Sequence, residues 1–159
     1  ESVREINLAT YVNEVMSTLA NEMKKNQVNY SFSGDNTIRI STIPGALAQV
    51  ITNLVNNSIR HGFQSGNENS YDINIKIEQN SIDEVCLTYH DNGIGMSKEV
   101  LTQVFDPFFT TKRNKGGTGL GMNIVYNVIE QKLSGHINID SNLGEGVTCI
   151  ITLPLILVA

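Results

Sequence analysis

Residues 44–61 read PGALAQVITNLVNNSIRH, a pattern typical of a long amphipathic helix. Apolar side chains recur every three or four positions and form one stripe, made of Leu47, Val50, Ile51, Leu54, Val55 and Ile59. Pro44 suits the first turn of a helix, where its missing N–H costs no hydrogen bond. A helix with a single apolar stripe has to bury it against a sheet or other helices, so this segment predicts a layered fold.

Further elements are predicted on both sides of this helix. We expect a second helix over residues 11–24, with Thr10 as its cap, a third over residues 119–133, and a short helical turn near residues 98–104. Alternating apolar and polar residues predict antiparallel strand pairs at 28–33 with 37–41, 73–77 with 85–89, and 136–140 with 147–153. The prediction is an α+β fold in which residues 1–159 form a single domain, a two-layer sandwich with three main helices on one face of a mixed sheet.

The composition excludes several functional classes. The chain has 159 residues and a net charge of -5, whereas a nucleic-acid binder needs positive charge to neutralise phosphates. Cys86 and Cys149 are too few for a disulfide framework and are expected to be reduced thiols. The longest apolar run is interrupted by Pro154, and we expect no signal peptide before Glu1. We therefore expect a cytoplasmic domain without direct membrane contact of its own, either separate or as the cytoplasmic part of a membrane-bound sensor.

The chemistry is expected in residues 91–121, because so long a segment with little regular structure is usually functional or disordered. It begins with Asp91-Asn92-Gly93-Ile94-Gly95-Met96, directly after a predicted strand. A carboxylate there can accept a hydrogen bond from the amino group of a flat heterocycle, and the two glycines let the backbone approach a ligand. The alternative is a plain Asp-Asn-Gly turn.

The same segment ends with Gly116-Gly117-Thr118-Gly119-Leu120-Gly121, where the third helix is expected to begin. Free backbone N–H groups and the positive end of the helix dipole would favour an anion such as phosphate. The glycine spacing differs from both the dinucleotide-binding fingerprint and the P-loop, so those two nucleotide folds are excluded. A hinge loop is the alternative.

Aromatic and basic residues lie between the two glycine motifs. Residues 105–112 (FDPFFTTK) hold three of the five phenylalanines, which predicts an anchor for a closing loop or a small satellite cluster. Lys112, Arg113 and Lys115 give residues 105–117 a charge of +2, against -7 for the rest of the chain. This concentration of positive charge suits a polyphosphate ligand, although a solvated surface run is the alternative.

Asn53, Asn57 and Arg60 share one face of the helix predicted at residues 44–61, because they occupy positions i, i+4 and i+7. An amide oxygen is a hard, neutral ligand that suits Mg²⁺, which takes few protein groups alongside phosphate oxygens and water. An ordinary solvated border of the apolar stripe is the alternative.

Taken in this order, the four segments resemble the sequence boxes of the sensor histidine kinases. The asparagine box corresponds to residues 53–61, the first glycine box to 91–96, the phenylalanine box to 105–112 and the second glycine box to 117–122. The resemblance extends from Ile6 to Pro154. It implies the Bergerat-type ATP-binding fold, which histidine kinases share with gyrase, heat-shock chaperone ATPases and MutL-like proteins, and it implies ATP and Mg²⁺ as cofactors.

The resemblance also implies roles for individual residues. Asp91 would receive the adenine amino group, and Asn57 would hold the Mg²⁺ that bridges the phosphates, with Asn53 supporting it one helical turn earlier. Further nucleotide contacts would come from Arg60 and His61 at phosphate or ribose, Gly93, Gly95 and Met96 around the purine, Thr148 near adenine, and Lys112, Lys115, Gly117, Thr118, Gly119, Leu120 and Gly121 in the lid and phosphate loop.

Asn53 favours a kinase over an ATPase. The ATPases that share the Bergerat fold commonly carry a glutamate at the position of Asn53, where it acts as the general base for water. An amide cannot take a proton at pH 7. His61, His90 and His136 lack the context of an acceptor histidine, which implies a separate helical acceptor domain, before Glu1 or on a partner, and a response regulator downstream. Two alternatives stay open: a serine kinase of the anti-sigma type, and an ATP-dependent switch without phosphoryl transfer.

Overall fold

The structure is a computed structural model that describes residues 2–63, 70–107 and 121–158. Its strands are β1 (Arg4–Asn7), β2 (Val28–Gly34), β3 (Arg39–Thr42), β4 (Tyr71–Gln79), β5 (Glu84–Asp91), β6 (His136–Ser141) and β7 (Val147–Pro154). Its helices are α1 (Leu8–Thr18), α2 (Ala20–Lys25), α3 (Pro44–Asn57), α4 (Lys98–Gln103) and α5 (Gly121–Asn127), with π-helical turns η1 (Ser58–Gly62) and η3 (Val128–Lys132).

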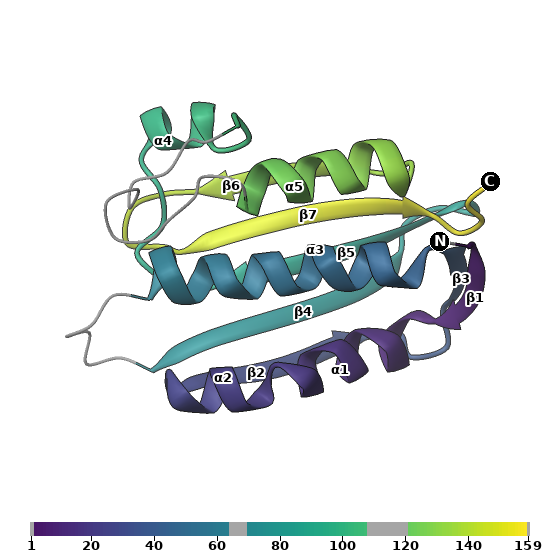
Figure 1. The fold of residues 1–159 in the computed structure, drawn as a ribbon, viewed down its shortest axis with the longest axis horizontal. Coiled ribbons are helices and arrows are strands. Elements are labelled where there is room, and N and C mark those ends of the chain that lie inside the picture. Colours follow the sequence, from purple (N-terminus) through teal and green to yellow (C-terminus); the bar gives the residue numbers. More distant parts are fainter. Residues whose placement is uncertain (1, 64–69, 108–120, 159) are drawn as a thin grey trace.

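The main sheet has five strands in the order β2-β4-β5-β7-β6. β2 runs parallel to β4 and the other neighbours are antiparallel, so the sheet is mixed. Figure 1 shows α1, α3 and α5 side by side across one face of it, and β1 with β3 in a separate small sheet at the end where both termini lie. The predicted α+β two-layer sandwich is confirmed.

The core lies between the helices and the sheet, and the register of the strands follows from it. In β4, Ile73, Ile75 and Ile77 are fully buried, whereas Asn74 and Lys76 between them face the other side. Burying one large aliphatic side chain contributes about 1.5–3 kcal/mol. A slip by one residue would expose the whole apolar set, so the alternation specifies the register.

The helix expected at residues 11–24 begins earlier and is interrupted. Asn7 is its cap, because its Oδ1 accepts the backbone N–H of Thr10 at 3.0 Å; the prediction of Thr10 as the cap was wrong. Leu8 and Ala9 are buried and extend the apolar stripe toward the N-terminus. At Leu19 the helix breaks, and the chain resumes as α2.

The hairpin predicted from residues 28–33 and 37–41 is wrong. β2 pairs with β4, and β3 pairs with β1. Gly34 lies so close to Ile77 that a Cβ there would overlap the Ile77 carbonyl oxygen, and the N–H of Asp35 bonds to that oxygen at 3.3 Å. The chain therefore follows β4 past the end of β2 instead of turning back on itself.

The other predicted pairs are confirmed: β4 with β5, and β6 with β7. So are α4 and the helix at residues 44–61, whose last turn is the π-helical η1, with the Phe63 N–H donating to Ser58 O at 2.8 Å. The end of the third helix at Ser134 and Gly135 is also confirmed, since Ser134 has a positive φ of 55°. Among the described residues, no helix is both long and apolar enough to cross a bilayer.

Both cysteines are free thiols, as predicted. Cys86 is half-buried, and Cys149 is buried beneath the helices. Burial raises the pKa of Cys149 to about 12, and the negative charge of Asp91 adds to this. Cys149 therefore behaves as a core residue rather than as a reactive thiol.

Candidate functional site

Motifs far apart in the sequence meet at one end of the sandwich. Asp91 is the last residue of β5, Asn57 is the last residue of α3, and Gly121 is the first residue of α5 in the described chain. Figure 1 shows these three ends together, opposite the termini. The loop after β5 contacts the turn after α3 directly, because the N–H of Ile94 donates to Gly62 O at 2.9 Å.

Asp91 is buried, with 3% of its surface exposed, and three donors hold its carboxylate. Oδ1 accepts the backbone N–H of Gly93 at 3.0 Å and of Val147 at 3.2 Å. Oδ2 accepts the hydroxyl of Ser58 at 2.6 Å. A buried charge needs such partners. Because they come from the loop after β5, from β7 and from η1, the fold itself sets the orientation of the carboxylate.

One acceptor direction of Asp91 is left over, on Oδ2. A carboxylate offers about four lone-pair directions, and the described donors use two on Oδ1 and one on Oδ2. Gly62 lies beside this oxygen: a Cβ built on it would stand 3.3 Å from Oδ2. A larger residue at position 62 would therefore crowd Oδ2. The site can therefore accept one more hydrogen bond, from an N–H donor directed at Oδ2.

Ser58 and Tyr89 extend this set of hydrogen bonds into the core. The Ser58 and Tyr89 hydroxyls lie 2.6 Å apart, and Tyr89 Oη lies 3.2 Å from Leu54 O. Burial raises the pKa of Tyr89 well above its usual value, so this hydroxyl keeps its proton. Neither residue was among those predicted from the sequence. Ser58 had a detectable signal, because it follows Leu54 by four positions and Val55 by three, and a polar residue on an apolar stripe needs a buried partner.

The glycines around Asp91 allow three backbone segments to approach closely. A Cβ on Gly93 would lie 2.5 Å from Gly62 O. Gly95 has a φ of +74°, and a Cβ there would overlap a carbonyl of the β6–β7 turn. A Cβ on Gly146, φ +76°, would overlap the backbone oxygen of Asp91. These glycines thus pack the loop after β5 between η1 and the β6–β7 turn, and so build the surroundings of the carboxylate.

The asparagines of α3 lie next to this group. Asn53 and Asn57 are one helical turn apart and half-buried, and within the described chain neither carboxamide has a hydrogen-bond partner. Asn57 directly precedes Ser58, the residue that bonds to Asp91. In η1, Arg60 is exposed and His61 is half-buried. The predicted metal ligand Asn57 therefore lies directly before the turn that bonds Asp91.

The predicted lid and phosphate loop are described only at their two ends. Gly121 begins α5, and at the other end the Phe105 ring lies 4.9 Å from the ring of Tyr126 on α5. The Asn123 side chain donates to Phe105 O at 3.0 Å, which attaches the start of this segment to α5. The remaining predicted residues lie outside the described part of the chain: Lys112, Lys115, Gly117, Thr118, Gly119 and Leu120.

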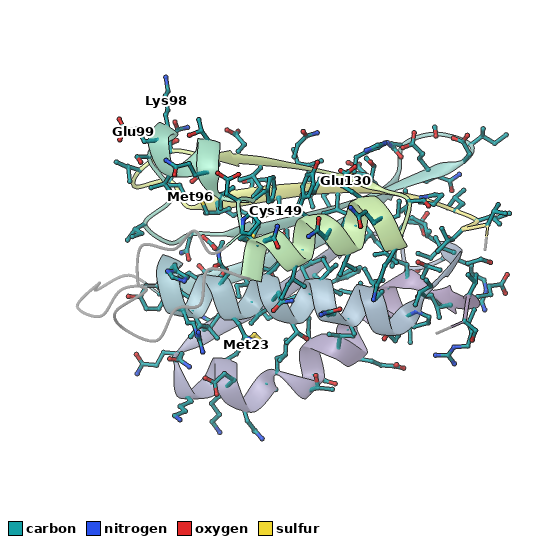
Figure 2. The ribbon with its side chains drawn as sticks, turned by 45° about the horizontal axis from the view of Figure 1, so that its top comes forward. Met23, Met96, Lys98, Glu99, Glu130 and Cys149 are labelled. Atoms are coloured by element: carbon teal, nitrogen blue, oxygen red, sulfur yellow. The ribbon has the colours of Figure 1, made fainter. Side chains whose placement is uncertain are left out.

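Met96 and α4 follow the loop that contains Asp91. The N–H of Met96 donates to Ser141 Oγ at 2.8 Å, and its side chain packs against the core. Ser97 then caps α4, and Figure 2 shows Lys98 and Glu99 pointing away from the rest of the molecule. Met96 thus holds the loop to β6, while α4 presents charged side chains to solvent.

Thr148 lies apart from this group, contrary to the expectation that it is near adenine. Side chains of β7 alternate, with Val147 and Cys149 buried on the helix side and Thr148 on the other side. The Thr148 hydroxyl lies 2.9 Å from His90 Nδ1 on the open face of the sheet. Val147, not Thr148, pairs with Asp91. A shift of one residue along a strand changes the face, which is why the expectation was wrong.

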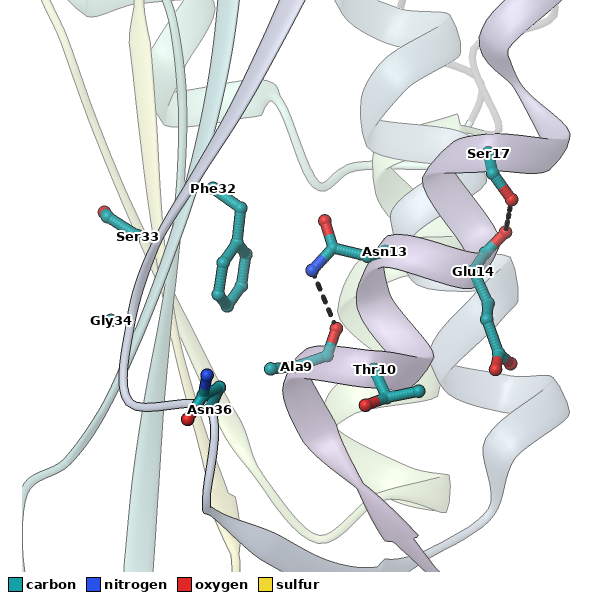
Figure 3. A pocket seen from close by; sticks show the side chains of 9 residues that line it. All are labelled: Ala9, Thr10, Asn13, Glu14, Ser17, Phe32, Ser33, Gly34 and Asn36. Carbon is teal, nitrogen blue, oxygen red and sulfur yellow. Dashed lines mark hydrogen bonds between the residues drawn. The ribbon is translucent and has the colours of Figure 1, made fainter.

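A hollow elsewhere on the surface lacks comparable chemistry. It lies between α1 and β2, and Figure 3 shows Phe32 and Asn36 on one wall and Asn13 on the other. Asn13 donates to a backbone carbonyl of α1 at 2.9 Å and accepts the Tyr30 hydroxyl at 2.9 Å. Because this amide is satisfied within the protein, it is not held ready for a ligand.

Comparison with known proteins identifies the family. Residues 42–157 match the family described as histidine kinase-, DNA gyrase B-, and HSP90-like ATPases, which is more than half of the chain. The chain belongs to this family. Within the histidine kinase-like ATPases, it is 31% identical over 156 residues to the sensor histidine kinase ZraS of Salmonella typhimurium and 37% identical over 112 residues to sporulation kinase E of Bacillus subtilis. These matches cover 98% and 70% of this chain but 32% and 14% of the relatives, so the chain spans a third or less of their length.

Solved structures of the histidine kinase-like family agree with this assignment. The catalytic domain of the histidine kinase ThkA superposes with a TM-score of 0.82 at 27% identity, covering 98% of this chain and 97% of that domain. A structure of ThkA in complex with the response regulator TrrA gives a TM-score of 0.75 at 26% identity, covering 96% of this chain and 42% of that one. The resemblance to the catalytic, ATP-binding domain of sensor histidine kinases is confirmed.

Proposed function

We propose that this chain binds ATP with Mg²⁺ and transfers the γ-phosphate to a histidine of a separate helical phosphoacceptor domain in two-component signalling. The observation that carries the proposal is the buried Asp91, whose Oδ2 has one open acceptor direction at the end of the sheet where α3 ends and α5 begins. Membership of the histidine kinase-like ATPase family supports the choice of ATP.

Adenine suits the open position on Asp91 because its 6-amino group is an N–H donor. A guanine ring would instead direct its 6-oxo lone pairs at the carboxylate, with no proton between the two oxygens. The donors on both oxygens, two backbone N–H groups on Oδ1 and the Ser58 hydroxyl on Oδ2, together prevent the carboxylate from turning to avoid this repulsion. A buried polar group left without its partner is penalised, so we expect strong selection for adenine.

Asn57 is proposed to hold Mg²⁺, with Asn53 supporting it. Its carboxamide is half-buried, lacks a hydrogen-bond partner in the described chain, and lies next to the residue that bonds Asp91. A neutral oxygen ligand fits an ion that draws most of its ligands from phosphate and water. When bound, the ion would neutralise phosphate oxygens. The other proposed nucleotide contacts are Arg60, His61, Gly93, Gly95, Met96, Lys112, Lys115, Gly117, Thr118, Gly119, Leu120 and Gly121.

Phosphoryl transfer, rather than hydrolysis, is favoured by Asn53. An amide at this position cannot remove a proton from water, so the site has no general base on the turn before Asn57. Catalysis would then consist of positioning the phosphate and stabilising its charge until the acceptor imidazole arrives. The complex of ThkA with a response regulator supports the proposal that such a regulator receives the phosphate next.

The test is to mix this chain with γ-labelled ATP, Mg²⁺ and a helical acceptor domain taken from a sensor kinase. We expect label on the acceptor in an acid-labile, base-stable form, which is the behaviour of phosphohistidine. The matched control is the same acceptor with its histidine replaced by alanine, which should stay unlabelled.

Other outcomes would point to the alternative functions. A stable phosphoserine on a partner would favour a serine kinase. Tight ATP binding without transfer to the acceptor domains tested would favour a nucleotide-dependent switch. Absence of ATP binding would contradict all three.

A further inference from the structure

Two buried hydroxyls lie behind Asp91 and have no part in the proposed function so far. Ser58 Oγ lies 2.6 Å from Asp91 Oδ2 and 2.6 Å from Tyr89 Oη. The exposed fractions of Tyr89, Ser58 and Asp91 are 1%, 2% and 3%. A series of polar side chains this deeply buried stabilises the fold only when every member is hydrogen-bonded. The three side chains are therefore held in one arrangement.

The groups at the two ends of this series of hydrogen bonds determine where the hydroxyl protons point. The Asp91 carboxylate has no proton to give, so the Ser58 hydroxyl donates to Oδ2. Ser58 Oγ can then accept the Tyr89 proton; the other neighbour of Tyr89 Oη, Leu54 O, is farther away at 3.2 Å and already accepts the Ser58 backbone N–H. Both hydroxyl dipoles are therefore aligned toward Asp91.

We infer that Ser58 and Tyr89 are positioning residues for adenine recognition, which hold Asp91 Oδ2 so that its open acceptor direction meets the 6-amino group. This inference rests on the proposed function. The two backbone donors hold only Oδ1, and Ser58 is the sole donor to Oδ2 among the described residues. Without that hydroxyl, Oδ2 could swing about Oδ1, and its bond to an incoming amino group would lose its alignment.

The experiment compares two nucleotides that differ only at the recognised group. Affinities for ATP and for purine riboside 5′-triphosphate, which lacks the 6-amino group, are measured by calorimetry with Mg²⁺ for the unaltered chain and for Ser58→Ala. A residue that acts through the 6-amino contact affects ATP alone. We expect Ser58→Ala to weaken ATP binding about tenfold and to leave the analogue unchanged.

Further variants separate positioning from general damage. Tyr89→Phe should cause a smaller loss, again confined to ATP, and it takes over the test if Ser58→Ala does not fold. Ser58→Thr keeps the hydroxyl and should restore most of the affinity for ATP. The matched control is Thr88→Val, which removes a hydroxyl next to Tyr89 in β5 but on the opposite face of the sheet. It should change the affinity for neither nucleotide.

The outcomes distinguish this inference from the proposed function. If the unaltered chain binds ATP no better than the analogue, the role of Asp91 in adenine recognition fails. If it prefers ATP but Ser58→Ala weakens both nucleotides equally, the hydroxyl is merely structural and the inference is overturned. An unchanged affinity for ATP in Ser58→Ala and Tyr89→Phe would overturn it as well.

Discussion

Replacing Asp91 with asparagine exchanges one carboxylate oxygen for an amide donor. Two backbone N–H groups face Oδ1, so the amide oxygen has to occupy that position and the NH₂ group takes the place of Oδ2. The NH₂ group then faces the proposed 6-amino group of adenine, donor against donor. The same side chain would suit a 6-oxopurine, whose oxygen accepts from the NH₂ group.

The expected loss of ATP affinity follows from two contributions. The charge-assisted hydrogen bond to the amino group is worth about 1.5–3 kcal/mol, and two donors left facing each other cost about 1–3 kcal/mol. Their sum, about 2.5–6 kcal/mol, corresponds to a Kd raised by roughly two to four orders of magnitude.

The fold should survive Asp91→Asn. The Ser58 hydroxyl can rotate to accept from the new NH₂ group and donate to Tyr89 Oη, 2.6 Å away, while Tyr89 turns its own proton to Leu54 O, 3.2 Å away. Every buried polar group then retains a partner. We expect a loss of about 1 kcal/mol in the free energy of unfolding, or about 2–4 °C in Tm for a domain of this size.

The assay is calorimetric titration of both proteins with ATP and with inosine triphosphate, the 6-oxo counterpart. We expect Asp91→Asn to lose ATP binding and to prefer inosine triphosphate, with thermal unfolding as the control for folding. An unchanged ATP affinity would contradict the contact between Asp91 and the 6-amino group. So would an equal loss for both nucleotides in a folded variant, because the 6-amino and 6-oxo groups should respond in opposite directions.

Four more changes test other parts of the site and the core. Asn57→Ala should weaken Mg²⁺ binding by about 100-fold and remove metal-dependent transfer while some nucleotide binding persists, measured by calorimetry with and without Mg²⁺. Asn53→Glu places a base one turn earlier and should raise ATP hydrolysis, read as phosphate release without an acceptor. Gly146→Ala should lower the free energy of unfolding, measured in denaturant, by about 2–4 kcal/mol. Gly144→Ala is the control and should cost less, because Gly144 also has a positive φ but a Cβ there would have no atom within 4 Å. Equal losses would exclude the close approach to Asp91 as the cause. Burial raises the pKa of Cys149 from 9.0 to about 12, so the unfolded chain loses this proton at a lower pH than the folded chain. The free energy of unfolding should therefore fall between these pH values by up to about 1.4 kcal/mol per pH unit. Cys149→Ala should reduce this slope, measured by denaturant unfolding at a series of pH values.

Local patterns predicted most of the fold, because most elements follow from residues close in sequence. α3, the β4–β5 pair and the β6–β7 pair each depend on a periodicity and a nearby turn. The pairing of β2 and β3 could not be predicted in this way. Their alternation predicted strands, but their partners β4 and β1 lie elsewhere in the chain, and alternation alone does not specify a partner.

The same limit explains which site residues were missed. Asp91 and Asn57 could be found because each belongs to a short motif with recognisable chemistry. The contact of Ser58 with Tyr89 joins residues 31 positions apart and exists only because α3 packs over β5. Thr148 shows the opposite difficulty, since its motif was found but its face of the sheet depends on a register that differs by one residue from the expectation.

The small sheet has a consequence for protein engineering. β3 pairs with β1 near the start of the chain, and Ser41 of β3 also bonds the C-terminal segment, through Leu155 O and the Leu157 N–H, both at 2.8 Å. Both chain ends are thereby held to one short strand, opposite the ends of α3 and β5 that carry the candidate site (Figure 1). Reporter fusions at either end, or a circular permutant that links the two ends, should leave nucleotide recognition intact.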